Sequence, residues 1–106
     1  MRMTAPLERV FRVFLDDPAA LRYGYDLMKA AGLKSGTLYP MLSRLEHEKL
    51  VTSGWETPRD QGGRPRKYYQ LTGEGIRVAR LELARVSAGR RPTAVVPVRP
   101  APGSLG

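Results

Sequence analysis

The stretch SGTLYPMLSRLEHEKLV, residues 35–51, carries the most regular apolar repeat in the chain. Leu38, Leu42 and Leu45 recur at the i, i+4 and i+7 spacing of an amphipathic helix. Ser35 suits the N-cap position, where a hydroxyl accepts a hydrogen bond from a free amide of the first turn. We expect a helix that begins at Ser35 and buries its leucines.

Two helices are predicted before this repeat. The first has Thr4 or Ala5 as its cap and Pro6 in its first turn. It ends at the DDP sequence, because a residue before proline is disfavoured in a helix. A shorter second helix lies in YGYDLMKAAG, residues 23–32, and Gly32 suits a left-handed exit from it. The helical spacing of the first segment is carried by Leu7, Val10, Phe11 and Phe14.

Two strands are predicted after the repeat, in LVTSGWET at 50–57 and in RKYYQLT at 66–72. Between them, PRDQGGRPR has two adjacent glycines and two prolines, which indicates a long hairpin loop. The basic residues assigned to this loop are Arg59, Arg64, Arg66 and Lys67. Trp55 is interpreted as an anchor in the core or at an interface, and alternatively as a platform for a flat effector.

A fourth helix is expected after Thr72, which suits the N-cap position, and should end near Gly89. The remaining residues, 90–106, contain four prolines and little apolar surface to bury, which is typical of a disordered, mildly basic tail. We therefore assign residues 1–89 to one domain and 90–106 to a tail.

The composition favours a polyanionic partner. The chain has 106 residues, enough for one compact domain, with 18 Lys and Arg against 10 Asp and Glu, a net charge of +8. Nucleic acid is the first expectation, ahead of an anionic membrane surface. There is no cysteine, and no stretch resembles a signal peptide or a membrane span. We expect a soluble cytoplasmic protein that is not inserted in a membrane.

Three helices, a basic hairpin and a closing helix are the element order of a winged helix-turn-helix, so the predicted fold is mainly α with a two-stranded β-hairpin. A helix-turn-helix places the N-terminal residues of its second helix against base edges in the major groove. The segment from residue 34 to 47 has a polar face opposite its leucines, formed by Thr37, Tyr39, Ser43, Arg44 and His47.

GTLYPMLSRLEHEKLV and GRPRKYYQLTGEG, separated by a glycine-rich loop, resemble the PadR family of bacterial winged-helix transcriptional regulators. The resemblance runs from about Leu7 to Val86. It implies a DNA-binding repressor, normally a homodimer, with the helix at 35–47 as reader and the hairpin as wing. It also implies that the tyrosine of GTLYP and basic wing residues face DNA, which here means Tyr39, Arg64, Arg66 and Lys67.

The chain is similar to the short members of that family, because it has room for a single helix after the wing. Dimer contacts are then expected from the first and fourth helices, through Val10, Phe14, Ile76 or Leu83. The full set of expected DNA contacts is Lys34, Ser35, Thr37, Tyr39, Ser43, Arg44, Arg64, Arg66 and Lys67.

Pro40 lies within the leucine repeat, although proline has no N–H to donate to a helical hydrogen bond and crowds the preceding turn. Two interpretations remain open. The position tolerates a proline near a helix start, or the distortion directs Thr37 and Tyr39 toward the groove.

Catalysis is not expected. His47 is the only histidine, and its neighbours Glu46 and Glu48 point in other directions on a helix. We find no spacing typical of metal ligands and no glycine-rich loop that could hold a phosphate. We therefore expect no catalytic residue, no metal ion and no cofactor. A small-molecule effector is left open. The alternative function is a winged-helix module that binds RNA or docks a protein.

Overall fold

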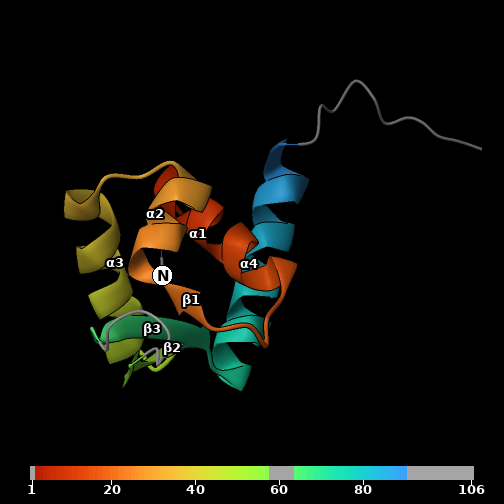
Figure 1. Ribbon diagram of the computed structural model, residues 1–106. Helices are drawn as coiled ribbons and strands as arrows, with labels where there is room; N and C mark the ends of the chain where they lie inside the picture. Colours follow the sequence, from red (N-terminus) through yellow and green to blue (C-terminus); the bar gives the residue numbers. More distant parts are fainter. Residues whose placement is uncertain (1, 58–63, 91–106) are drawn as a thin grey trace, which may run out of the picture.

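The computed structural model describes residues 2–57 and 64–90, which form four helices and a small sheet (Figure 1). The elements follow in the order α1 (Ala5–Asp16), β1 (Arg22–Tyr23), α2 (Gly24–Ala31), α3 (Ser35–His47), β2 (Val51–Glu56), β3 (Arg66–Leu71) and α4 (Gly73–Arg90). In Figure 1, α3 and α4 lie on either side of α1 and α2, and the sheet lies below them. The arrangement is the winged helix-turn-helix that the sequence predicts.

The ends of α1 and α2 are formed by the residues that the sequence suggests. The Leu7 amide donates to the Thr4 hydroxyl over 3.3 Å, which caps α1, and Pro6 lies in its first turn. Gly32 ends α2 in the left-handed conformation, with φ of 65°. The Leu33 amide then donates to the Met28 carbonyl over 3.0 Å, which satisfies a free carbonyl at the helix end.

The start of α3 differs from the expectation by one residue. Lys34 is the N-cap and has no side-chain capping bond, while Ser35 is the first helical residue. The predicted capping role of Ser35 is therefore wrong. The amides of Thr37 and Leu38 both donate to the Lys34 carbonyl, over 3.0 and 2.9 Å. The helix continues through Pro40, whose missing N–H leaves the Gly36 carbonyl without its usual helical donor.

The sheet has three strands rather than the predicted two, in the order β1-β3-β2 and all antiparallel. β1 pairs Arg22 with Tyr69 and Tyr23 with Tyr68. A two-residue strand has too few positions to show an alternating pattern, so periodicity does not reveal it. Arg66 and Lys67 belong to β3, which corrects their placement in the hairpin loop. Arg59 lies outside the described residues.

The core lies where α1, α2 and α3 meet the sheet. Leu38, Leu42 and Leu45 are buried, as expected from their spacing. Val10 and Phe14 have exposed fractions of 0% and 1%, so the monomer core contains these two side chains and a partner subunit cannot reach them. Their expected dimer contact is corrected accordingly. Ile76 and Leu83 pack against the core and stay partly exposed.

The junction between the sheet and α4 is held by backbone contacts. The Thr72 hydroxyl accepts from the Gly75 amide over 2.9 Å and donates to the Lys49 carbonyl over 2.8 Å, so it caps α4 as predicted. A Cβ atom at residue 75 would lie 1.9 Å from the Leu50 carbonyl oxygen. Only glycine allows this approach of α4 to the start of β2. The tail assigned to 90–106 lies, from residue 91 on, outside the described residues.

Candidate nucleic-acid interface

The outer face of α3 carries the polar residues that the sequence predicts as DNA contacts. Tyr39 has 40% of its surface exposed, and the remaining expected contacts in this region are also exposed: Lys34, Ser35, Thr37, Ser43 and Arg44. The first turn of α3 contains no acidic residue. With Lys34 beside them, the unpaired amides of this turn make the helix start electropositive. Such an end favours a phosphate group.

Tyr39 is held against the start of α2. A Cβ atom at residue 24 would lie 2.3 Å from the Tyr39 hydroxyl oxygen, so the tyrosine ring occupies the space that Gly24 leaves empty. Gly24 itself is buried. The close approach shows that Gly24 sets the position of Tyr39. This role of Gly24 is not visible in the sequence, because its contact with Tyr39 arises only when α2 and α3 pack together on folding.

A hydrogen bond connects α3 to the wing. The Ser53 hydroxyl on β2 donates to the Glu46 carboxylate on α3 over 2.6 Å. Val51, Ser53 and Trp55 lie on one face of β2, because side chains alternate along a strand. The face of the sheet that carries Trp55 is therefore the face that meets α3.

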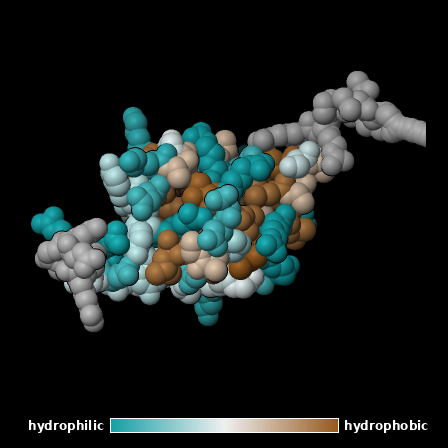
Figure 2. Space-filling view, turned by 45° about the vertical axis from the view of Figure 1, so that its right-hand side comes forward, coloured by the Kyte–Doolittle hydropathy of each residue, from teal (hydrophilic) through white to brown (hydrophobic). Residues whose placement is uncertain are grey.

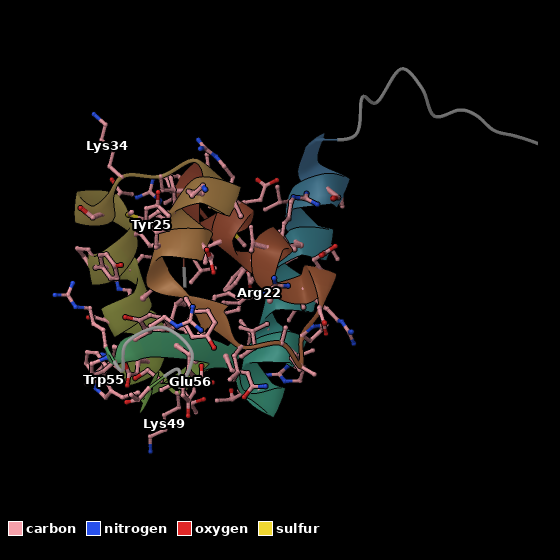
Figure 3. The ribbon with its side chains drawn as sticks, viewed as in Figure 1. Arg22, Tyr25, Lys34, Lys49, Trp55 and Glu56 are labelled. Atoms are coloured by element: carbon pink, nitrogen blue, oxygen red, sulfur yellow. The ribbon has the colours of Figure 1, made fainter. Side chains whose placement is uncertain are left out.

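The interpretation of Trp55 as an anchor in the core is wrong, because 68% of its surface is exposed, while its interpretation as an interface anchor or an effector platform stays a prediction. Trp55 pairs with Lys67 across the strands, and the Lys67 ammonium lies 5.9 Å from the indole ring and 5.6 Å from the ring of the buried Tyr69. Both distances fit cation–π contacts. Figure 3 shows Trp55 at the sheet and Lys34 at the other end of α3.

Arg64 is exposed beside the hairpin loop, whereas Arg66 is engaged within the protein. The Arg66 guanidinium lies 3.9 Å from the centre of the Tyr23 ring, and its Nη2 atom is 3.9 Å from a Glu56 carboxylate oxygen. Its Nε atom is buried and has no hydrogen-bond partner among the described residues. These contacts place Arg66 against β1, so it has less freedom than Arg64 to reach a phosphate.

Tyr23, Glu56 and Arg66 form one cluster, in which the Tyr23 hydroxyl donates a hydrogen bond to the Glu56 carboxylate. The hydrogen bond to Glu56 and the partial burial of the phenol raise the pKa of Tyr23 above its ordinary value. Because Tyr23 directly precedes α2 and Glu56 ends β2, the cluster connects the helix-turn-helix to the loop end of the two wing strands.

The described part of the chain contains neither a group of metal ligands nor a helix that could span a membrane. His47 is exposed on α3. No three His, Asp or Glu side chains within 2–57 and 64–90 are grouped so that they could hold a metal ion. Over the same residues, no helix is both long and apolar enough to cross a membrane.

Comparisons with known proteins agree with this geometry. A PadR-like transcription factor from Bacteroides fragilis is 34% identical, with 78% of this chain and 82% of that chain covered and a TM-score of 0.57. A PadR family transcription regulator from Clostridium difficile R20291 is 29% identical, with 76% and 91% covered and a TM-score of 0.58. A protein from Streptococcus mutans UA159 is 25% identical, with 85% of each chain covered and a TM-score of 0.67.

No protein of curated function matches the chain. The sequence model of the PadR-like family of transcriptional regulators matches residues 19–81, from the connection between α1 and β1 through the wing into α4. Because this match covers more than half of the 106 residues, the chain belongs to the PadR-like family of transcriptional regulators.

Proposed function

We propose that this regulator is a repressor that binds a roughly palindromic operator as a homodimer. The observation that carries the proposal is the exposed, electropositive N-terminal half of α3, where Tyr39 packs against Gly24. The hydrogen bond between Ser53 and Glu46 joins the C-terminal end of the same helix to the wing. In a symmetric dimer, two such helices would enter successive major grooves about 34 Å apart. Bound in that way, the protein would occlude a promoter.

Each part of the interface has a separate role in this proposal. The residues at the start of α3, Thr37 and Tyr39 above all, contact base edges and select the sequence. Lys34, Arg64 and Lys67 contact phosphates, which supplies affinity for any sequence and makes binding sensitive to salt. Ser35, Ser43 and Arg44 lie along the same exposed helix and complete the surface. We assign Arg66 a supporting role at the loop end of the wing strands.

The dimer contact is proposed for α4. Leu81 has 42% of its surface exposed on the outer side of α4, whereas Ile76 and Leu83 keep part of their surface exposed at the side that packs against the core. Figure 2 shows hydrophobic side chains at the surface on the side that the view turns forward, which is the side of α4 in Figure 1. Burial of such side chains in a symmetric contact would remove apolar surface from water.

The test of DNA binding is a titration of the full chain against duplex DNA from the region upstream of its own gene, at several salt concentrations. A shuffled duplex of the same length is the control. We expect tight binding of two chains to the native duplex and weak, strongly salt-dependent binding to the shuffled one. Equal binding to both duplexes at every salt concentration would contradict operator recognition at this site.

The test of the dimer is sedimentation equilibrium of the Leu81→Glu variant. Leu81 is exposed, so a charge there leaves the monomer core intact and places an unpaired carboxylate in the proposed contact. We expect a dimeric wild-type protein and a largely monomeric variant. Arg80→Gln, which alters an exposed neighbour on the same helix, is the control and should remain dimeric. A monomeric wild-type protein at concentrations that saturate the operator would overturn the dimer.

A further inference from the structure

Trp55 exposes a large apolar side chain to water near the loop end of the wing. It is the only tryptophan of the chain, and its exposed fraction of 68% is the highest among the large hydrophobic residues in the part that the structure describes. Tryptophan is enriched in the contact surfaces of proteins, where its ring can bury about 150 to 250 Å². An indole that contributes so little to the monomer core is therefore free to contact a partner.

Three cross-strand pairs lie on the face of the sheet that meets α3. From the core toward the loop they are Val51–Leu71, Ser53–Tyr69 and Trp55–Lys67. The first pair and Tyr69 are buried, so the third pair is the one at which this face reaches solvent. Two residues of a strand advance by about 7 Å. Trp55 therefore projects past the position at which Ser53 binds the Glu46 carboxylate of α3.

The buried Tyr69 connects the exposed pair to α3. Burial raises the pKa of the Tyr69 phenol, and Tyr39 and Glu46, both on α3, lie close enough to add to the rise. The Lys67 ammonium lies 5.6 Å from the Tyr69 ring and 5.9 Å from the indole ring. A row of neighbouring side chains therefore leads from α3 to the indole. Figure 3 shows Trp55 at the end of α3 that is nearest the sheet.

The surroundings of the indole are apolar and cationic. Lys67 forms no ion pair within residues 2–57 and 64–90. Glu56, the acidic residue next to Trp55 in the chain, lies on the opposite face of the strand, where Tyr23 and Arg66 engage it. The DNA backbone repeats an apolar deoxyribose and an anionic phosphate. An indole beside a free ammonium group complements both parts of this repeat.

We propose that Trp55 packs on a deoxyribose of the DNA backbone that flanks the groove entered by α3, while Lys67 binds the adjacent phosphate. With α3 in the major groove, a side chain that projects past the edge of the helix meets this backbone. The sugar contact involves no base and no charge, so it adds affinity for any sequence and depends little on salt. The proposal rests on the proposed binding of duplex DNA, but not on repression, a dimer or a palindromic site.

The contact is tested by salt titrations of two Trp55 variants on the native and shuffled duplexes. Trp55→Ala should weaken binding to both duplexes by about tenfold, within the range found when an aromatic platform for nucleic acid is removed. The slope of log K against log salt should not change, in contrast to the loss of a phosphate contact. Trp55→Phe keeps an aromatic ring and should recover most of the affinity. Trp55→Ala with wild-type affinity for both duplexes would overturn the proposal.

Leu21→Ala is the control for these variants. Leu21 is also an exposed apolar residue, but it directly precedes β1, at the opposite edge of the sheet from β2. It should bind both duplexes like the wild type. Because neither side chain belongs to the core, all three variants should keep the wild-type circular dichroism spectrum.

The emission of Trp55 reports on the contact directly, because the chain has no other tryptophan. Saturating duplex should protect the indole of the full wild-type chain from acrylamide and lower the quenching constant several-fold. Equal protection by native and shuffled duplexes of equal affinity would support the contact and contradict operator recognition. Tight, selective binding of the native duplex with an unchanged quenching constant would overturn the contact and leave the proposed function intact.

Discussion

At the scale of single residues, the structure gives a positioning role to four residues that no sequence pattern singles out. Gly24, Glu46, Ser53 and Glu56 touch residues that the sequence places in the DNA-binding surface or next to it. Their role is to fix the position of those residues. A helix start and a wing that are held in place lose less conformational freedom on binding DNA.

Gly24→Ala should weaken operator binding without unfolding the protein. The added Cβ atom would meet the far end of the Tyr39 side chain, which can rotate away at small cost, so the ring moves and the core stays. We expect a loss of about 1–3 kcal/mol in operator binding, as for one lost base contact. Fluorescence anisotropy with labelled operator measures it.

The control for Gly24→Ala is Gly73→Ala, because a Cβ atom at residue 73 would meet no atom within 4 Å. This variant should bind the operator like the wild type. A Gly24→Ala protein with unchanged operator affinity would show that the position of Tyr39 does not matter for recognition.

Glu56→Gln should lower the pKa of Tyr23 toward its ordinary value of 10.0, because the hydrogen bond to Glu56 is the largest cause that raises this pKa and the Glu56 charge adds to it. A raised pKa in the folded state means that the folded protein holds the phenolic proton more tightly than the unfolded chain does. The contribution to stability is therefore complete below pH 10 and is lost as the pH rises through the folded pKa.

Ring resonances of Tyr23 in an NMR pH titration measure this pKa. Glu48→Gln is a suitable control, since Glu48 is an exposed carboxylate at the end of α3 that makes no contact with Tyr23 among those described. A Tyr23 titration that is the same in Glu56→Gln and the wild type would contradict the connection between β1 and the wing.

At the scale of elements, α3 combines two demands that oppose each other. Its leucines require a regular helix that packs on α1, α2 and the sheet, and Pro40 removes one backbone hydrogen bond from the middle of that helix. The structure keeps both, because the proline is exposed and the leucines lie on the opposite face. The helix therefore retains its packing on the core despite the lost hydrogen bond.

Pro40→Ala is expected to keep the fold and weaken operator binding. Restoring the amide should stabilise the helix, by up to about 3 kcal/mol in the free energy of unfolding, the difference between proline and alanine inside a helix. The altered first turns would present Thr37 and Tyr39 less well to the groove. Thermal unfolding and operator titration of the same preparation test both effects. Unchanged operator affinity would favour the interpretation that the position merely tolerates proline.

At the scale of the whole molecule, charge and shape act together. The chain carries a net charge of +8, and its basic residues include Lys34 at the start of α3 and Arg64 and Lys67 on the wing. A positive surface of this kind releases counterions when it covers phosphates, so the affinity for DNA falls as salt concentration rises. The net charge predicts a polyanionic partner, while the fold decides which surface meets it.

Lys67→Gln should weaken binding to operator and shuffled duplexes by similar factors and should reduce the slope of log K against log salt by about 1. The reason is that a phosphate contact carries no sequence information. Thr37→Val should instead weaken operator binding with little change on the shuffled duplex. Salt titrations of both variants on both duplexes measure these effects. A salt slope that Lys67→Gln leaves unchanged would remove Lys67 from the phosphate contacts.

The sequence by itself determined the four helices, the hairpin and the leucine core, because these follow from local spacing, caps and turn residues that act over a few positions. Thr4, Gly32 and Thr72 act at helix ends as their local sequence predicts. The family was also visible, in the GTLYP and GRPRKYY segments. Local rules placed the cap of α3 one residue late, since Lys34 and Ser35 are both compatible with a helix start.

Only the tertiary structure decided what depends on contacts between distant segments. The pairing of β1 with β3, the burial of Val10 and Phe14 and the exposure of Trp55 each depend on which elements cover them. Arg66 looks like a free basic residue in the sequence, yet Tyr23, 43 positions earlier, and Glu56 engage it on folding. The pair that Trp55 forms with Lys67 exists for the same reason, because the two residues are 12 positions apart and meet only when β2 and β3 align in the folded chain.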